Sequence, residues 1–88
     1  MIKKRFKITA ETGLHDRPAT LLVQTATRYD AKINLICHDQ AVDLKSIMGV
    51  MSLGVGQGET IVIAADGKDD RAAMNSIVKT MKKEGLSD

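Results

Sequence analysis

Residues 12–20 read Thr12-Gly13-Leu14-His15-Asp16-Arg17-Pro18-Ala19-Thr20 and follow a stretch in which apolar and charged residues alternate. Gly13 provides the backbone freedom that a turn needs. Pro18 fits only the first turn of a helix, because it lacks an N–H and its ring clashes further along. A strand-to-helix turn is therefore predicted, with His15 at or just before the helix N-terminus. Unpaired backbone N–H groups at a helix N-terminus attract anions, so His15 and Arg17 can hold a phosphoryl group there. The alternative is that His15 is only a polar capping residue and that Arg17 is nearby by chance.

The rest of the chain predicts four strands and three helices in the order β-α-β-β-α-β-α. Residues 2–8, 32–37, 41–43 and 59–65 alternate in the manner of half-buried strands. The helices are expected from the Pro18 turn to about Arg28, from a Ser46 cap to about Leu53, and from an Asp69 or Asp70 cap to just before Gly85. The apolar stripe of the last helix is expected at Met74, Ile77, Val78 and Met81. Connections of these lengths favour an α+β fold with a mostly antiparallel sheet and helices on one face.

Composition limits the classes of protein to which the chain can belong. It has 88 residues, enough for one domain, and no apolar run near the ~20 residues of a membrane span. The lone Cys37 cannot form an internal disulfide, and no secretory h-region follows the basic start, so a cytoplasmic protein is expected. A net charge of +2 and only two aromatic residues argue against direct nucleic-acid binding. A small chain with charged strand faces is also expected to be a monomer.

Two blocks of the chain are similar to a known family. Gly13–Thr20 resembles the active-site motif of HPr, the phosphocarrier of the bacterial phosphotransferase system. Leu44–Gly54 resembles the regulatory serine segment of the Gram-positive HPr proteins, and the similarity continues through Thr25, Tyr29, Gly58 and Glu84-Gly85-Leu86. Asp16 departs from the pattern, since the family usually has a small residue there. The resemblance implies an open-faced β-sandwich, a single HPr-like domain over residues 1–88, and no cofactor.

The resemblance implies that His15, through Nδ1, takes a phosphoryl group from phosphoenolpyruvate-charged enzyme I and passes it to sugar-specific enzyme IIA domains. A neutral imidazole is a good nucleophile near neutral pH, because its reference pKa is about 6.5. Positioning and charge neutralisation dominate phosphoryl transfer, and the helix amides and the Arg17 guanidinium can supply both. The protein is then a phosphorylated intermediate of a relay, not an enzyme.

Asp16 raises a separate question about the same site. A carboxylate close to the ring would repel the incoming phosphoryl group and favour the protonated imidazole. We therefore expect Asp16 to point away from His15 and to weaken transfer mildly or alter the choice of partner. The alternative is a solvated residue at the helix start with no effect.

Ser46 has both a structural and a regulatory interpretation. Its position before a short apolar helix predicts an N-cap. The resemblance implies phosphorylation of Ser46 by HPr kinase/phosphorylase and recruitment of the catabolite control transcription factor. A phosphate at a helix N-terminus meets free N–H groups, so the fold should survive this modification.

The short helix also predicts a protein-docking surface. It is too small to bury all its apolar residues, so Ile47 and Met48 are expected outside and Val50 and Leu53 inside. The expected partner-binding residues are Arg17, Gln24, Ile47, Met48 and Met51. The alternative is that Ile47, Met48 and Met51 all belong to the core.

The sequence also allows two functions other than that of a carrier, and it contains one possible metal site. A regulatory HPr-like paralogue would act in carbon catabolite repression through Ser46 alone, and the presence of His15 argues against it. A generic binding module would use the Ile47, Met48 and Met51 surface without phosphoryl chemistry. Cys37, His38 and Asp39 are consecutive and should point in different directions with no second ligand pair, so a solvated turn histidine and no metal site are expected.

Overall fold

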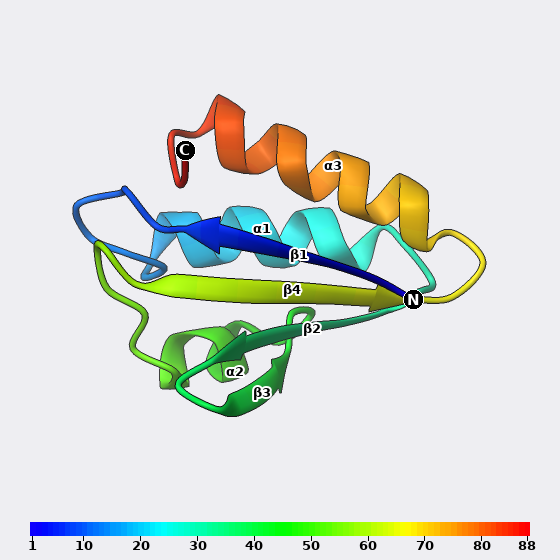
Figure 1. Cartoon of the computed structure of the whole chain (residues 1–88), viewed down its shortest axis with the longest axis horizontal. Helices are drawn as coiled ribbons and strands as arrows, with labels where there is room; N and C mark the ends of the chain where they lie inside the picture. Colours follow the sequence, from blue (N-terminus) through cyan, green and yellow to red (C-terminus); the bar gives the residue numbers. More distant parts are fainter.

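The computed structural model describes the whole chain, residues 1–88, and contains the seven predicted elements in the predicted order. They are β1 (Ile2–Lys7), α1 (Arg17–Thr27), β2 (Lys32–Cys37), β3 (Gln40–Asp43), α2 (Ile47–Ser52), β4 (Thr60–Asp66) and α3 (Asp70–Lys83). The strands form one sheet in the order β1-β4-β2-β3, and every neighbouring pair is antiparallel (Figure 1). The predicted α+β, open-faced β-sandwich is confirmed.

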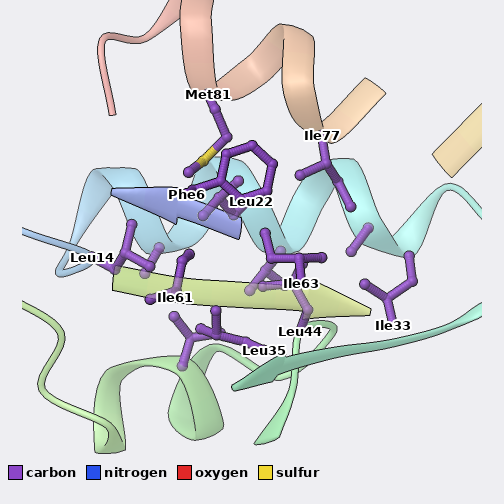
Figure 2. Packing of buried hydrophobic residues seen from close by; sticks show 14 of the residues in the cluster. Phe6, Leu14, Leu22, Ile33, Leu35, Leu44, Ile61, Ile63, Ile77 and Met81 are labelled. Atoms are coloured by element: carbon purple, nitrogen blue, oxygen red, sulfur yellow. The ribbon is translucent and has the colours of Figure 1, made fainter. Parts of the chain in front are cut away.

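Alternation along the strands explains why only one face of the sheet carries helices. Ile33 and Leu35 of β2 and Ile61 and Ile63 of β4 are completely buried, and the residues between them in β2 are partly exposed. The buried side chains meet those of the helices, including Leu22 of α1 and Ile77 and Met81 of α3 (Figure 2). Helices α1 and α3 pack against each other, and α2 packs against α1 and β3. None of the three helices combines the length and apolar character needed to cross a bilayer.

The structure moves a few element boundaries and one core residue. Strand β3 begins at Gln40 instead of residue 41, and β4 covers Thr60–Asp66 instead of residues 59–65. In α3, Val78 is only partly buried and Ala73 takes its place in the core. Ala73, Ile77 and Met81 are spaced at i, i+4 and i+8, so they form the line that faces the sheet.

Asp69 occupies the N-cap position of α3, but its side chain makes no capping hydrogen bond. Its two carboxylate oxygens instead accept the Asp30 and Ala31 amides, each at 2.8 Å. The Asp30 amide first, and the Ala31 amide after it, hold the pKa of Asp69 below its usual value. Asp69, the predicted cap, therefore links the start of α3 to the connection from α1 to β2 by two hydrogen bonds.

Candidate functional site

The turn that presents His15 is anchored by the two residues that precede the exposed ring. Leu14 is buried, and its amide donates to the Val55 carbonyl at 3.0 Å. The Gly13 amide donates to the Ala10 carbonyl at 2.9 Å, and Gly13 has a φ of +67°. The His15 side chain is 57 % exposed. A solvent-facing imidazole thus stands on a backbone that hydrogen bonds and a buried side chain hold in place.

Helix α1 starts at Arg17, with Asp16 as the N-cap between it and His15, as the position of Pro18 predicted. Its first i to i−4 hydrogen bond runs from the Thr20 amide to the Asp16 carbonyl at 3.0 Å. The Arg17 and Ala19 amides lie ahead of that bond and have no acceptor within the helix. The turn that carries His15 therefore leads into the positive end of an 11-residue helix, where free backbone donors favour an anion.

The expectation that Asp16 points away from His15 is wrong. The Asp16 Oδ2 atom lies 3.3 Å from His15 Nδ1. Asp16 has φ 52° and ψ −118°, a backbone conformation that favours glycine and costs other residues on the order of 1–3 kcal/mol. This positive φ redirects the Asp16 side chain from the course that a normal helix-start residue would take. An Nδ1–H that donates to Asp16 leaves the lone pair on Nε2, so attack through Nδ1 requires this contact to open.

Replacing Asp16 with asparagine is expected to speed phosphorylation of His15 by about two- to fivefold. This factor corresponds to the interaction energy of an exposed pair of charges. The amide keeps the size of the side chain, tolerates a positive φ and removes the charge that repels phosphoryl oxygens. Initial rates of phosphoryl transfer from enzyme I measure the effect. The control is Asp30→Asn, an exposed carboxylate beyond the far end of α1, which should leave the rate unchanged. An equal rate for Asp16→Asn and the natural protein would contradict the expectation.

The two predicted partner residues of α1 have different surroundings. Arg17 is exposed and forms no hydrogen bond or ion pair in the structure, so its guanidinium is free to turn toward a phosphoryl group. Gln24 is exposed and lines an open groove between α1 and α3, together with Arg28 and Lys79. The structure does not place Gln24 against α2, and its role in docking stays a prediction.

Helix α2 has the predicted cap and the predicted exposure. The Ser46 hydroxyl accepts the Gly49 amide at 3.1 Å, so Ser46 is the N-cap. Ile47 is 41 % exposed and Met48 is 79 % exposed, and Met51 is half-buried. Val50 and Leu53 lie in the core, as expected. Apart from Met1, Ile47 and Met48 are the only large apolar residues that are exposed, and they lie on a helix that packs against α1.

Comparison with known proteins settles the family. The family model for the PTS HPr component phosphorylation site matches residues 2–83. The chain belongs to the HPr family. Members of this family are phosphocarriers of the phosphotransferase system, and the matched segment includes both the His15 turn and α2.

Solved structures of HPr proteins share the whole fold. The histidine-containing phosphocarrier protein of Mycoplasma is 37 % identical, with 98 % of each chain covered and a TM-score of 0.95. An HPr of Thermoanaerobacter tengcongensis is 39 % identical, with coverage of 96 % of this chain and 94 % of that one and a TM-score of 0.91.

A third similar structure bears on the oligomeric state. It is the catabolite repression protein Crh of Bacillus subtilis, which is 34 % identical, with 96 % and 97 % of the two chains covered and a TM-score of 0.73. That structure is described as an intertwined dimer with a swapped domain. The expectation of a monomer, which was drawn only from size and surface charge, therefore finds no support among these relatives.

No sequence motif identifies the residues that support the His15 turn from a distant part of the chain. Val55 and Gly56 precede β4 and lie against Gly13, and the Glu59 carboxylate accepts the Gly56 amide at 2.7 Å. That bond is the main cause of a pKa below the usual value for Glu59, and His38 contributes to it. These contacts depend on how the segment before β4 folds back, which no local motif encodes.

Proposed function

We propose that this protein accepts a phosphoryl group on His15 from phosphoenolpyruvate-charged enzyme I and passes it to sugar-specific enzyme IIA domains. The observation that carries the proposal is the exposed His15 imidazole directly before the N-terminus of α1, in a chain of the HPr family. Residues 1–88 act as one domain in the cytoplasm. The relay step itself uses no cofactor, and the protein has no catalytic cycle of its own.

Each transfer is a displacement at phosphorus. An imidazole lone pair forms the N–P bond while the donor's bond to phosphorus breaks, and the reverse exchange loads the acceptor. The free Arg17 and Ala19 amides and the Arg17 guanidinium face the negative charge that spreads over the phosphoryl oxygens. Ile47, Met48 and Met51 supply an adaptable apolar surface that can dock onto different partners in turn.

Ser46 is the proposed regulatory site, phosphorylated by HPr kinase/phosphorylase. Its side chain lies at the start of α2 and next to the exposed Ile47 and Met48. A phosphate there adds about two negative charges beside the docking surface while the backbone around it is retained. This charge should weaken docking of the sugar-transport partners and favour the catabolite control transcription factor.

A regulatory paralogue that acts only through Ser46 is the second candidate, and the similarity to Crh is the observation that favours it. Both roles can be tested on the natural protein by intact-mass analysis. Incubation with enzyme I and phosphoenolpyruvate should add one phosphoryl group that is lost in acid. Incubation with ATP and the kinase should add one that is stable in acid and absent from Ser46→Ala. A protein that takes only the acid-stable group is a regulator, and the carrier proposal then fails.

Replacing Arg17 with alanine is expected to slow phosphoryl transfer about 10- to 100-fold, the equivalent of one hydrogen bond to a charged group. Arg17→Lys should recover part of the rate, because lysine restores the positive charge but lacks the planar guanidinium that donates two hydrogen bonds to a phosphoryl group. Arg28→Ala removes the arginine just past the other end of α1 and should leave the rate near that of the natural protein. Single-turnover transfer from phosphorylated enzyme I distinguishes these variants. Equal losses for the two alanine variants would mean that Arg17 acts only through net charge.

A further inference from the structure

The turn between β2 and β3 places a histidine and a cysteine side by side at one end of the sheet. It consists of His38 and Asp39, with φ values of +53° and +61°, and the flanking Cys37 and Gln40 pair directly. Two central residues with positive φ make the tight hairpin turn that matches the twist of the strands. The Cys37 side chain is buried, and the His38 side chain is 55 % exposed.

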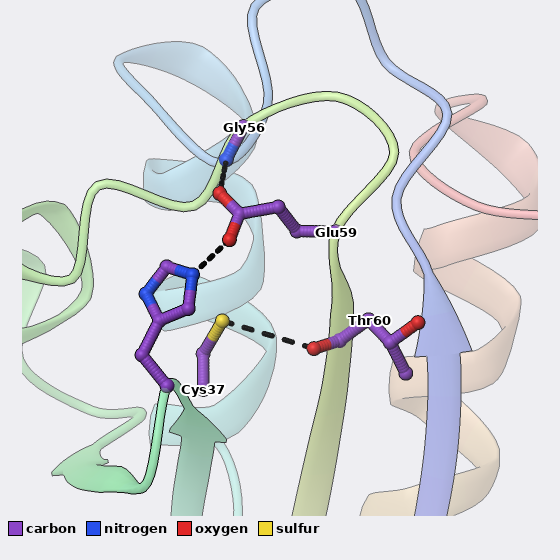
Figure 3. Close-up of polar contacts among 5 residues, drawn as sticks. Cys37, Gly56, Glu59 and Thr60 are labelled. Atoms are coloured by element: carbon purple, nitrogen blue, oxygen red, sulfur yellow. Dashed lines mark hydrogen bonds and ion pairs between the residues drawn. The ribbon is translucent and has the colours of Figure 1, made fainter.

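Glu59 reaches the same place from a distant part of the chain. It precedes β4, which pairs with β2, so it lies beside the strand end that carries Cys37. One Glu59 carboxylate oxygen contacts His38 Nε2, and the other accepts the Gly56 amide (Figure 3). The Cys37 Sγ atom lies 3.7 Å from the Thr60 carbonyl, a weak contact for sulfur. One ligand atom from each of Cys37, His38 and Glu59 lies within 4.8 Å of the other two.

These three donor groups suit a transition-metal ion better than Mg²⁺ or Ca²⁺. Thiolate sulfur, imidazole nitrogen and carboxylate oxygen are the groups that bind Zn²⁺, whereas Mg²⁺ and Ca²⁺ prefer oxygen alone. Bond lengths of 2.0–2.3 Å put neighbouring tetrahedral ligands about 3.3–3.8 Å apart. The contact between His38 and Glu59 must therefore open to admit an ion, while any pair of donors as far apart as 4.8 Å must close by about 1 Å. We propose that Cys37, His38 and Glu59 bind one Zn²⁺ ion, with water as the fourth ligand.

The surroundings already orient the proposed ligands. The Gly56 amide holds the Glu59 carboxylate in place, which is the role that second-layer hydrogen bonds have in zinc sites. His38 Nε2 and the Glu59 oxygen face each other, so an ion that displaces the ring proton can use both lone pairs. Cysteine binds zinc as the thiolate, so the Cys37 proton leaves when the ion binds.

A bound ion would add metal–ligand bonds to the polar contacts that already connect two distant parts of the chain. It would link the β2–β3 turn to the segment before β4, and Val55 in that segment accepts the Leu14 amide beside His15. In the sequence, only Cys37, His38 and Asp39 lie together, and these three residues alone predict no metal site. Glu59 supplies the third ligand, and the positive φ of His38 turns the imidazole back toward it.

The test is a titration of the reduced, full-length protein with Zn²⁺ in competition with a chromophoric chelator. One ion per chain is expected, and Co²⁺ should give a thiolate-to-cobalt charge-transfer band without need of any variant. Cys37→Ser, His38→Asn and Glu59→Gln should each weaken binding by at least about tenfold. The control is His15→Asn, which removes the other exposed histidine beside a carboxylate and should bind as the natural protein does.

Thermal unfolding provides a second measurement, and it requires no variant of Cys37. Zn²⁺ should raise the Tm of the natural protein and of His15→Asn, and leave that of His38→Asn unchanged. Asparagine tolerates the positive φ of position 38, so that variant should remain folded. Absence of stoichiometric binding, a cobalt complex without the charge-transfer band, or loss of binding in His15→Asn instead of His38→Asn would each overturn the proposal.

Discussion

Replacing His15 with alanine is expected to reduce acid-labile phosphorylation by at least about 10³-fold, below detection, because the nucleophile is lost. The fold should be unaffected. The ring is more than half exposed, and its only polar contact is with Asp16, so the change in unfolding free energy should stay within about 0.5 kcal/mol. Intact-mass analysis after incubation with enzyme I and phosphoenolpyruvate measures the first effect, and thermal unfolding the second.

The chain contains its own matched control for this experiment. His38 is as exposed as His15, at 55 % against 57 %, and each imidazole faces a carboxylate, Glu59 in one case and Asp16 in the other. Only His15 lies at the start of a helix with free amides. His38→Ala should therefore take up the phosphoryl group at the normal rate. Phosphorylation that persists in His15→Ala, or that is lost in His38→Ala, would show that the helix terminus does not select the nucleophile.

Local periodicity was enough to predict the elements of the fold. Alternation over residues 32–37 predicted β2 with its exact bounds, and Ile33 and Leu35 face the core as expected. The same kind of argument correctly separated exposed Ile47 and Met48 from buried Val50. These predictions succeed because a side chain's direction along a strand or helix follows from its position in the repeat. Periodicity does not specify the order of the strands in the sheet, and the resemblance implied only the open-faced β-sandwich.

The failures involve backbone angles and distant contacts, which periodicity does not specify. Asp16 lies against His15 because Asp16 has a positive φ, which is unusual for a residue other than glycine. No sequence pattern predicts this conformation. Asp69 binds the Asp30 and Ala31 amides instead of capping α3, because the chain brings the end of α1 to it. Glu59 reaches His38 only because β2 and β4 pair in the observed register.

The distant contact with the largest consequence is the one at Gly13. A Cβ atom there would lie 2.1 Å from the Val55 carbonyl oxygen and 2.8 Å from Gly56 Cα, both backbone atoms that cannot rotate away. The φ of +67° adds strain for any residue with a side chain. The strain costs about 1–2 kcal/mol and the overpacking about 1–3 kcal/mol, so Gly13→Ala should lose about 2–5 kcal/mol of stability.

For a domain of this size, that loss corresponds to a Tm lower by about 10 °C or more, measurable by calorimetry. Gly54→Ala is the control, because Gly54 has a similar φ of +60° but nothing within 4 Å of its built Cβ. Gly54→Ala should lose only the stability that corresponds to backbone strain, about 1–2 kcal/mol.

Because the Leu14 amide donates to the same Val55 carbonyl, displacing that carbonyl also loosens the turn that holds His15. Phosphorylation of the folded Gly13→Ala protein should therefore slow while that of Gly54→Ala does not. Equal Tm losses would mean that backbone strain alone, and not the contact with Val55, makes glycine necessary at position 13.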